Sequence, residues 1–295
     1  MRNPSILVPI DFSELSRNAL RAGDQLAAAL GGHVVPMHAY EPLTSLEGFS
    51  FHGPDGTVSG DFSVVTAEIE RAMQTFAARD VDVTRLRPGR FVSGQAARAI
   101  AEVAVDFDLV VISSHGRSGF SRMLLGSVTD RVLRLTTSPV LVVYGKPTLD
   151  PLQHIVVPTD LSANSSAVLP VVQALAQASG ATVDLLHVHI AGEAPVSTAQ
   201  LEDRVRDFAT NHASVDTTGW TTTILVASGT VEDVLSQHLQ DDPANLVVMA
   251  THGVRSGPST LLGRAPASVV RNVRTAALLV TPASARAARL SETKA

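Results

Sequence analysis

A glycine- and serine-rich loop between an apolar run and an amphipathic run carries the clearest chemistry in this sequence. The apolar run is Leu109–Ile112, the loop covers residues 113–126, and the run after it places Val128, Val132 and Leu135 at helical spacing. The first run is typical of a buried strand and the second of a helix. A helix that begins after such a loop presents unpaired backbone N–H groups and the positive end of its dipole, which together suit a phosphate. The sequence therefore predicts an anion-binding loop.

The same pattern occurs in both halves of the chain. Residues 155–162 repeat residues 6–13, and Gly253 repeats Gly116. The offset within the first pair is larger than within the second, so the second copy is shorter. The natural place for the missing residues is the long Gly-, Ser- and Pro-rich segment 41–62. A repeat on this scale indicates duplication of a whole domain.

Short apolar strands alternate with amphipathic helices along each half. In the first half the predicted strands are 5–9, 33–39, 109–112 and 138–143, and a further strand lies within 83–92, where Pro88–Gly89 interrupts it. The predicted helices are 14–30, 64–79, 95–105 and 128–135. Pro36 fits poorly in a central strand, since proline donates no hydrogen bond to a neighbour. The alternation predicts an α/β fold: two tandem, open, five-stranded parallel-sheet domains of Rossmann-like type, covering residues 1–146 and 152–284.

Ligands of open parallel sheets bind outside the carboxyl ends of the strands. We expect the nucleoside end of a ligand at the ends of the first two strands and its phosphates over the loop and the following helix start. The candidate residues of the first half are Pro9, Ile10, Asp11, Ala39, Ser113, His115, Gly116, Arg117, Gly126, Ser127 and Val128. Those of the second half are Pro158, Thr159, Asp160, Val188, Gly253, Gly263 and Arg264.

Several of these residues have a structural alternative. Asp11 either faces the ligand or braces the turn into the first helix. His38 is expected to pack at its strand end, and His115 either touches the ligand or hydrogen-bonds within the loop. Arg117 is a phosphate ligand or a solvated loop charge. Arg264 either contacts a phosphate through a charge-assisted bond or fills the pocket.

Composition excludes several classes of function. The 295 residues are 45% hydrophobic, 4% aromatic and 17% charged, with a net charge of −5 and no cysteine. Disulfides, zinc–thiolate sites and thiol catalysis are therefore excluded. A basic stripe with aromatic residues is missing, so nucleic acid is not an expected partner. Apolar runs stay well below the ~20 residues that span a bilayer, so a membrane is not expected either.

Recognisable catalytic signatures are missing from the sequence. It contains no P-loop pattern G-x4-G-K followed by Ser or Thr, no G-x-S-x-G elbow and no H-E-x-x-H motif. No metal-ligand spacing is present, so we expect no metal bound by the protein alone. The chain is expected to be no dedicated enzyme, with slow ATP hydrolysis at most. Without a hydrophobic signal segment near Met1, we expect it in the cytoplasm.

Residues 6–13 (ILVPIDFS), His38 and the spacing Ser113-x2-Gly116-x9-Gly126-Ser127 together resemble the universal stress protein family. The ATP-binding branch of that family has the loop G-x2-G-x9-G followed by Ser or Thr. The resemblance covers nearly all of both halves. It implies a fold like that of the adenine nucleotide alpha-hydrolases, bound ATP with Mg or Mn on its phosphates, and a role in the stress response.

The family also implies dimerisation through the last strand. In a tandem chain this predicts an intramolecular pseudo-dimer through Val140–Val143 and Ala277–Val280, and leaves further homodimerisation plausible. Each half departs from the loop pattern. Ser113 replaces the first glycine in the first half, while Ala250 replaces it and Arg264 replaces the final Ser or Thr in the second. The first site is therefore expected to be the better binder.

Three alternatives stay open at this point: an interaction protein with both sites empty, a weak ATPase, and a protein whose ligand is cyclic AMP or AMP. The glycine that ends the loop offers a test of the first site. Gly126→Val is expected to remove nucleotide binding in the first half while the fold stays intact, because a side chain would block close approach to the phosphates.

Overall fold

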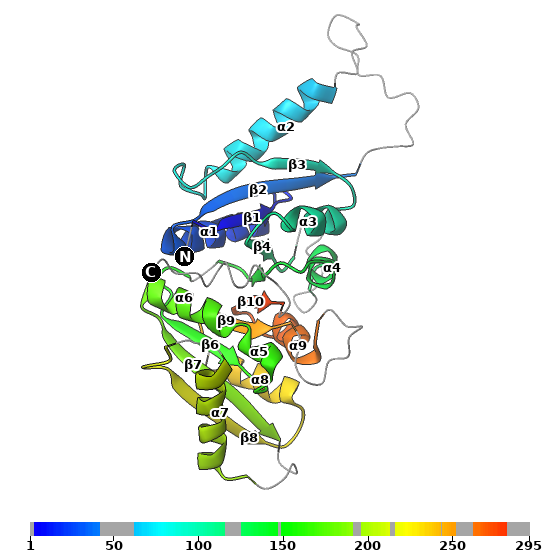
Figure 1. Ribbon diagram of the computed structural model, residues 1–295. Helices are drawn as coiled ribbons and strands as arrows, with labels where there is room; N and C mark the ends of the chain where they lie inside the picture. The colour runs from blue at the N-terminus through cyan, green and yellow to red at the C-terminus, as the bar shows by residue number, and fades with distance from the viewer. Residues whose placement is uncertain are drawn as a thin grey trace, which may run out of the picture.

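The computed structural model describes residues 3–41, 62–115, 125–146, 149–190, 196–212, 216–242, 244–251 and 262–281, apart from the side chains of residues 62–65 and 212. The two halves lie one above the other in Figure 1, and both repeat the order predicted for a parallel α/β domain.

Strands and helices alternate in both halves. The first half consists of β1 (Ser5–Pro9), α1 (Glu14–Leu30), β2 (His33–Tyr40), α2 (Phe62–Ala77), β3 (Arg90–Ser93), α3 (Ala96–Ala104), β4 (Leu109–Ser113), α4 (Ser127–Leu135) and β5 (Val140–Val143). The second half consists of β6 (His154–Pro158), α5 (Ala163–Ser166), α6 (Leu169–Ser179), β7 (Thr182–Ile190), α7 (Thr198–His212), β8 (Thr221–Ala227), α8 (Val231–Asp241), β9 (Leu246–Ala250), α9 (Arg264–Asn272) and β10 (Ala276–Val280).

One 10-stranded sheet runs through both halves, in the order β3-β2-β1-β4-β5-β10-β9-β6-β7-β8. Each half is parallel within itself, and β5 and β10 join the halves as an antiparallel pair with Leu141 opposite Leu278. This confirms the predicted fold class and the predicted pairing of the last strands. The pairing gives each half a neighbour for a strand that would otherwise be an open edge.

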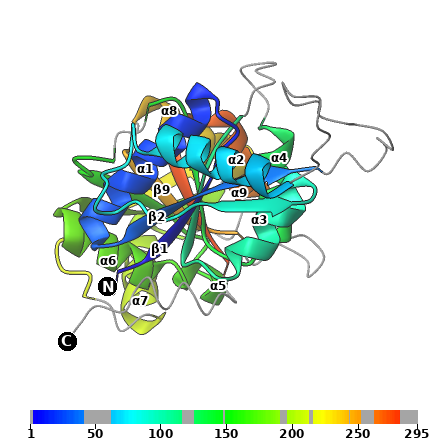
Figure 2. The ribbon, with the colours of Figure 1, turned by 90° about the horizontal axis from the view of Figure 1, so that it is seen from above.

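Both faces of this sheet carry a core that crosses the boundary between the halves. One core packs α1, α2, α6 and α7 against the sheet and includes Leu141 and Leu278. The other packs α3, α4, α8 and α9 and includes Val142 and Ala277. Figure 2 shows the strands running through the middle of the molecule with the helices around them. Each hydrophobic core is therefore continuous across the two halves.

Pro36 lies inside β2, and its neighbours show how a central strand tolerates it. The N–H and carbonyl of Val34 both bond to the adjoining segment 85–87. Because backbone polar groups alternate in direction along a strand, the nitrogen of Pro36 faces the same side, opposite Pro88–Gly89. The missing N–H thus falls where the neighbouring chain is already irregular. The strand β3 begins at Arg90, just after the Pro88–Gly89 interruption that the sequence showed within 83–92.

The predicted apolar face of α4 was wrong. Val132 is buried, but Val128 and Leu135 are 38% and 46% exposed. The buried face consists of Thr129, Val132 and Leu133 instead. These residues are spaced as i, i+3 and i+4, so the helix is rotated relative to the stripe expected from its most apolar residues. This rotation turns Val128 toward solvent at the start of the helix.

Candidate functional site

The turn that follows β1 is built by Asp11 and Ser13. The Oδ1 atom of Asp11 accepts hydrogen bonds from the N–H of Ser13 at 3.0 Å and from its hydroxyl at 2.5 Å. The Ser13 oxygen accepts in turn from the N–H of Ser16 at 3.2 Å, which caps α1. The structural role offered for Asp11 by the sequence is therefore present.

The turn after β6 has the same construction. Asp160 accepts from the N–H of Ser162 at 3.1 Å and from its hydroxyl at 2.6 Å, and Ser162 caps the next helix through the N–H of Ser165. The residues between, Phe12 and Leu161, have φ of 63° and 60°. A left-handed conformation costs a non-glycine residue roughly 1–2 kcal/mol. Both copies keep this strained turn, so the carboxylates occupy equivalent places.

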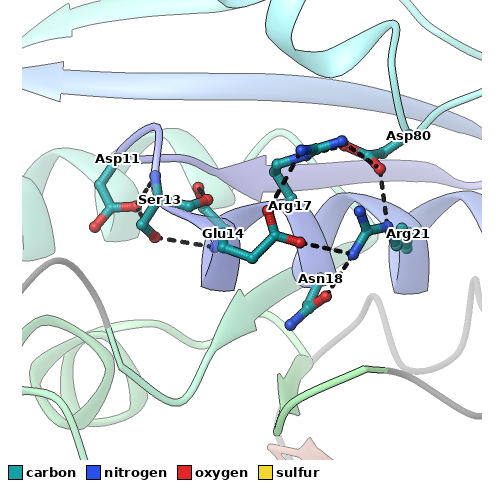
Figure 3. A network of polar contacts seen from close by, with 8 residues as sticks. Asp11, Ser13, Glu14, Arg17, Asn18, Arg21 and Asp80 are labelled. Atoms are coloured by element: carbon teal, nitrogen blue, oxygen red, sulfur yellow. Dashed lines mark hydrogen bonds and ion pairs between the residues drawn. The ribbon is translucent and has the colours of Figure 1, made fainter. Parts of the chain in front are cut away.

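A buried carboxylate holds the start of α1 to the chain that leaves α2. Asp80 lies 2.7 Å from the Arg17 Nε atom and 2.8 Å from the Arg21 Nε atom, and its side chain is only 4% exposed. The bond to Asp80 is the main reason that the pKa of Arg17 is raised. Figure 3 shows this network beginning one helical turn from Asp11. The network fixes the helix that the Asp11 turn introduces.

His38 and His187 tie the second strand of each half to the turn after the first. The Nδ1 atom of His38 lies 2.8 Å from the carbonyl of Ile10, and that of His187 lies 3.0 Å from the carbonyl of Thr159. A carbonyl accepts only, so each Nδ1 carries a proton. Burial is the main cause that lowers the pKa of His187. Both histidines thus have the packing role expected of His38.

Aromatic rings gather beside His38 in the first half. The ring centroid of Phe12 lies 5.1 Å from that of His38. The Phe91 ring is stacked with its centroid 6.1 Å from that of His38 and 4.3 Å from that of Tyr40. Sequence reasoning placed a strand within 83–92 but missed this cluster, because it did not give the register that brings Phe91 opposite His38. In the second half the residue opposite His187 is Ile224, so the equivalent position carries no aromatic ring.

The ends of the phosphate loop approach each other closely. The N–H of Gly126 donates to the carbonyl of Ser114 at 2.7 Å, and the N–H of Gly263 donates to that of Thr251 at 2.7 Å. A Cβ atom on Gly126 would lie 3.0 Å from the Ser114 oxygen and 3.2 Å from the Cα atom of His115. The glycine therefore allows a close contact between backbone segments, and a side chain here would press on the fold as well as on a ligand.

We now predict that Gly126→Val destabilises the protein. Valine would press on the backbone of Ser114 and His115, and overpacking of this kind costs about 1–3 kcal/mol. Thermal unfolding followed by circular dichroism should show a lower midpoint, with Gly126→Ala between the valine variant and the wild type. An unchanged midpoint for Gly126→Val would contradict the close approach.

Unpaired N–H groups mark the start of α4. Gly126 is its N-cap and offers no side chain, and the first helical hydrogen bond runs from the N–H of Asp130 to the carbonyl of Gly126. The N–H groups of Ser127 and Val128 therefore lack partners within the helix. Both residues are exposed, while Thr129 is buried and donates to the carbonyl of Ser113 at 2.7 Å. The helix start is thus anchored to β4 and open to solvent.

The start of α9 has the same backbone arrangement as the start of α4 but carries a charged side chain, that of Arg264. Gly263 is its N-cap, and the N–H of Ala267 donates to the carbonyl of Gly263 at 3.0 Å. The Arg264 side chain is 82% exposed and its Nε atom lies 3.2 Å from Glu232 of α8. Arg264 therefore does not fill a pocket, and a carboxylate already shares its charge.

The remaining candidates lie along the same edge. Because β1 is hydrogen-bonded to β2 and to β4, the carboxyl ends of these strands meet. Ile10 is buried and donates its N–H to Met37, and Thr159 likewise donates to Leu186. Exposure differs among the others: Pro9 and Pro158 are buried, Ala39, Asp11 and Val188 are half-buried, and Asp160 is exposed.

His115 stands at the entrance of the loop. Its Nδ1 atom lies 3.0 Å from the hydroxyl of Ser114, and its carbonyl accepts from the hydroxyl of Ser113 at 2.8 Å. Its Nε2 atom is buried and has no hydrogen-bond partner among the described residues. The hydrogen bonding within the loop that the sequence allowed for His115 is therefore present. Gly116, Arg117 and Gly253 lie outside the described residues.

Within the described ranges, no group of three or more His, Asp or Glu side chains is arranged to hold a metal ion. Among the helices that the structure describes, none is both long enough and apolar enough to cross a membrane.

Comparison with known proteins gives the family. The model of the universal stress protein family matches residues 3–144 and 151–281. A universal stress protein of Mycobacterium tuberculosis, Rv2005c, is 32% identical over 144 residues, which are 46% of this chain and 44% of that protein. The chain therefore spans less than half the length of this relative.

Solved structures support the fold over the whole chain. A universal stress protein from Archaeoglobus fulgidus covers 96% of this chain and all of its own, with a TM-score of 0.69 and 19% identity. A universal stress protein solved in complex with cAMP is 26% identical and covers 48% of this chain and 96% of its own, with a TM-score of 0.34. With a match to the family model in each half, the chain belongs to the universal stress protein family.

Proposed function

We propose that this protein binds an adenine nucleotide, ATP in particular, at the carboxyl edge of its first half, and that it serves the stress response by holding or sensing that nucleotide. The start of α4 carries the proposal. Its first N–H groups belong to Ser127 and Val128, which are exposed residues, and these groups lack partners within the helix. Thr129 anchors this helix start to the end of β4. An anion is the natural partner of such a helix start.

The neighbouring strand ends suit the other end of a nucleotide. Pro9 and Ile10 form a buried apolar floor at the end of β1, and half-buried Ala39 lies on β2 beside it. Small-molecule sites are mostly apolar with a few convergent polar groups, and this edge has that composition. Asp11 adds a carboxylate whose position is set by Ser13. The base and ribose are proposed to lie here, with the phosphates toward α4.

The second half is proposed as the weaker site. Pro158, Thr159, Asp160 and Val188 repeat the nucleoside side of the first site, and the Gly263 N-cap repeats the phosphate side. Arg264 forms an ion pair with Glu232, and this carboxylate lowers the net positive charge that is available to a phosphate. We therefore infer that ATP fills the first site before the second.

Calorimetric titration of the full chain with ATP, AMP and cAMP, each with and without Mg²⁺, tests this proposal. We expect ATP to bind more tightly than AMP, since AMP reaches less of the α4 start. cAMP is included because it is the ligand of a solved family member. If ATP at millimolar concentration produces no binding heat and no thermal shift, the proposal is overturned. That result would favour an interaction protein of the same fold.

Catalysis is not part of the proposal. Two of the candidate acid–base groups have structural roles: Asp11 braces its turn, and His38 bonds to the carbonyl of Ile10. We expect phosphate release from ATP to stay at the buffer background. Release above background that is lost in Asp11→Ala would instead make this protein a weak ATPase.

We also infer a cytoplasmic location, with homodimerisation of the full chain a further possibility. The pairing of β5 with β10 already satisfies the last strand of each half within one chain, so a second copy would have to use another surface. Light scattering of the purified chain with and without ATP measures this directly.

A further inference from the structure

The C-terminal end of α9, whose N-terminus belongs to the proposed second site, contacts α4, whose N-terminus belongs to the first. The Arg271 Nη2 atom, near the end of α9, lies 3.2 Å from the Oδ1 atom of Asp130 in the first turn of α4. The two helices lie side by side where the halves meet (Figure 1). The second half therefore places a positive charge beside the start of α4.

Tyr144 fixes the end of α9 from the first half. Its hydroxyl donates to the carbonyl of Val270, the residue before Arg271. That carbonyl belongs to the last turn of α9, where carbonyls lack helical partners. Burial raises the pKa of Tyr144 well above its usual range, so the hydroxyl keeps its proton and remains a donor. The backbone that carries Arg271 is thus held in place across the boundary.

The ion pair between Arg271 and Asp130 matters for a ligand because of where Asp130 lies. It lies one turn into α4, on the helix whose first N–H groups are proposed to hold phosphate. The hydrogen bond from Arg134, at 2.9 Å, is the main cause that lowers the pKa of Asp130, and Arg271 adds to it. The carboxylate therefore stays ionised at neutral pH. Left uncompensated, it would repel an anion at the same helix end.

The contact has no counterpart in the other direction. Counted from the two N-caps, Gly126 and Gly263, Arg134 is the equivalent of Arg271, and Ala267 stands where the first half has Asp130. Arg134 therefore finds no carboxylate at the equivalent place on α9 and bonds to Asp130 within its own helix. In the part of the chain that the structure describes, this contact from the opposite half reaches the first turn of α4 and has no equivalent at the first turn of α9.

We propose that Arg271 is a positioning residue of the first site, through which the second half raises the affinity of that site for the phosphates of a nucleotide. The proposal rests on the proposed function. Arg271 touches no ligand; it acts by compensating Asp130 and by holding the first turn of α4. The first half alone lacks this contribution.

The test is Arg271→Gln in the full chain, with ATP affinity measured by calorimetry. Loss of one partly screened charge near the phosphates should weaken binding about two- to fivefold, and the difference should shrink in high salt. Arg271→Lys should recover part of the loss. Arg206→Gln is the matched control, because it removes an exposed guanidinium of the second half that pairs with Asp203 on its own helix, α7.

A second variant separates electrostatics from general damage. Asp130→Asn should bind ATP at least as tightly as the wild type, and Arg271→Gln should have a smaller further effect in that background, because its contact with the Asp130 carboxylate is already gone. An Arg271→Gln protein that binds like the wild type, or that loses as much affinity when Asp130 is already Asn, would overturn this inference alone. Absence of ATP binding by the wild-type chain would overturn the proposed function as well.

Discussion

Ser127→Asp is expected to weaken ATP binding tenfold or more while leaving the protein at least as stable as the wild type. Ser127 is the first residue of α4 and is exposed. A carboxylate at a helix N-terminus is favourable by about 0.3–1 kcal/mol. The same carboxylate would face the phosphates, and two like charges 4 Å apart repel by roughly 1 kcal/mol in water and about 4 kcal/mol near a protein surface.

The opposite signs of the two effects make the measurement selective. Calorimetry reports the affinity and thermal unfolding reports the stability, and a misfolded variant would lose both. Ser127→Ala serves as the control, because it removes the hydroxyl and adds no charge; the loss of one neutral hydrogen bond costs about 1 kcal/mol. If Ser127→Asp binds ATP as well as Ser127→Ala does, the phosphates do not lie at the start of α4.

Leu141→Ala and Leu278→Ala are expected to destabilise the whole chain, each by about 2–5 kcal/mol. These leucines lie opposite each other on β5 and β10 and are 0% and 2% exposed. They belong to one core that packs helices of both halves. Truncation of either one leaves a cavity at the centre of that core. We therefore expect a single unfolding transition, shifted to lower denaturant, in both variants.

Denaturant unfolding followed by circular dichroism and by the fluorescence of Trp220 distinguishes the alternatives. Trp220 packs against the same core in the second half, so its signal reports that half. Leu141 lies in the first half, and a shift of the Trp220 transition in Leu141→Ala would show that the halves unfold together. Two separate transitions would contradict a shared core. Val83→Ala is the control, since Val83 is 79% exposed.

Much of the fold follows from local sequence. Alternating apolar and amphipathic runs predicted the parallel α/β halves, and the repeat of residues 6–13 at 155–162 predicted two of them. The caps of α1 were also predictable, because Ser13 lies just before an amphipathic run and Gly31 just after it. Patterns of this kind depend only on residues that are close in sequence, so they can be recognised without knowledge of the tertiary structure.

The candidate site was predictable in part. The strand ends that flank it follow from the rule that ligands meet the carboxyl edge of a parallel sheet. The order of strands β2-β1-β4 is what brings residues near 10, 39 and 113 to that edge. By contrast, the sequence assigned Gly126 to ligand approach, whereas the structure shows it against the backbone of Ser114.

The sequence by itself therefore determined the duplicated α/β pattern, the capped turns at Asp11 and Asp160, and the edge at which a ligand is expected. The tertiary structure alone decided which face of α4 is buried, that Gly126 lies against the backbone of Ser114, and that Arg271 meets Asp130. The reason is physical. Periodicity and capping depend on residues a few positions apart, whereas burial and charge pairing depend on segments that only the folded sheet brings together.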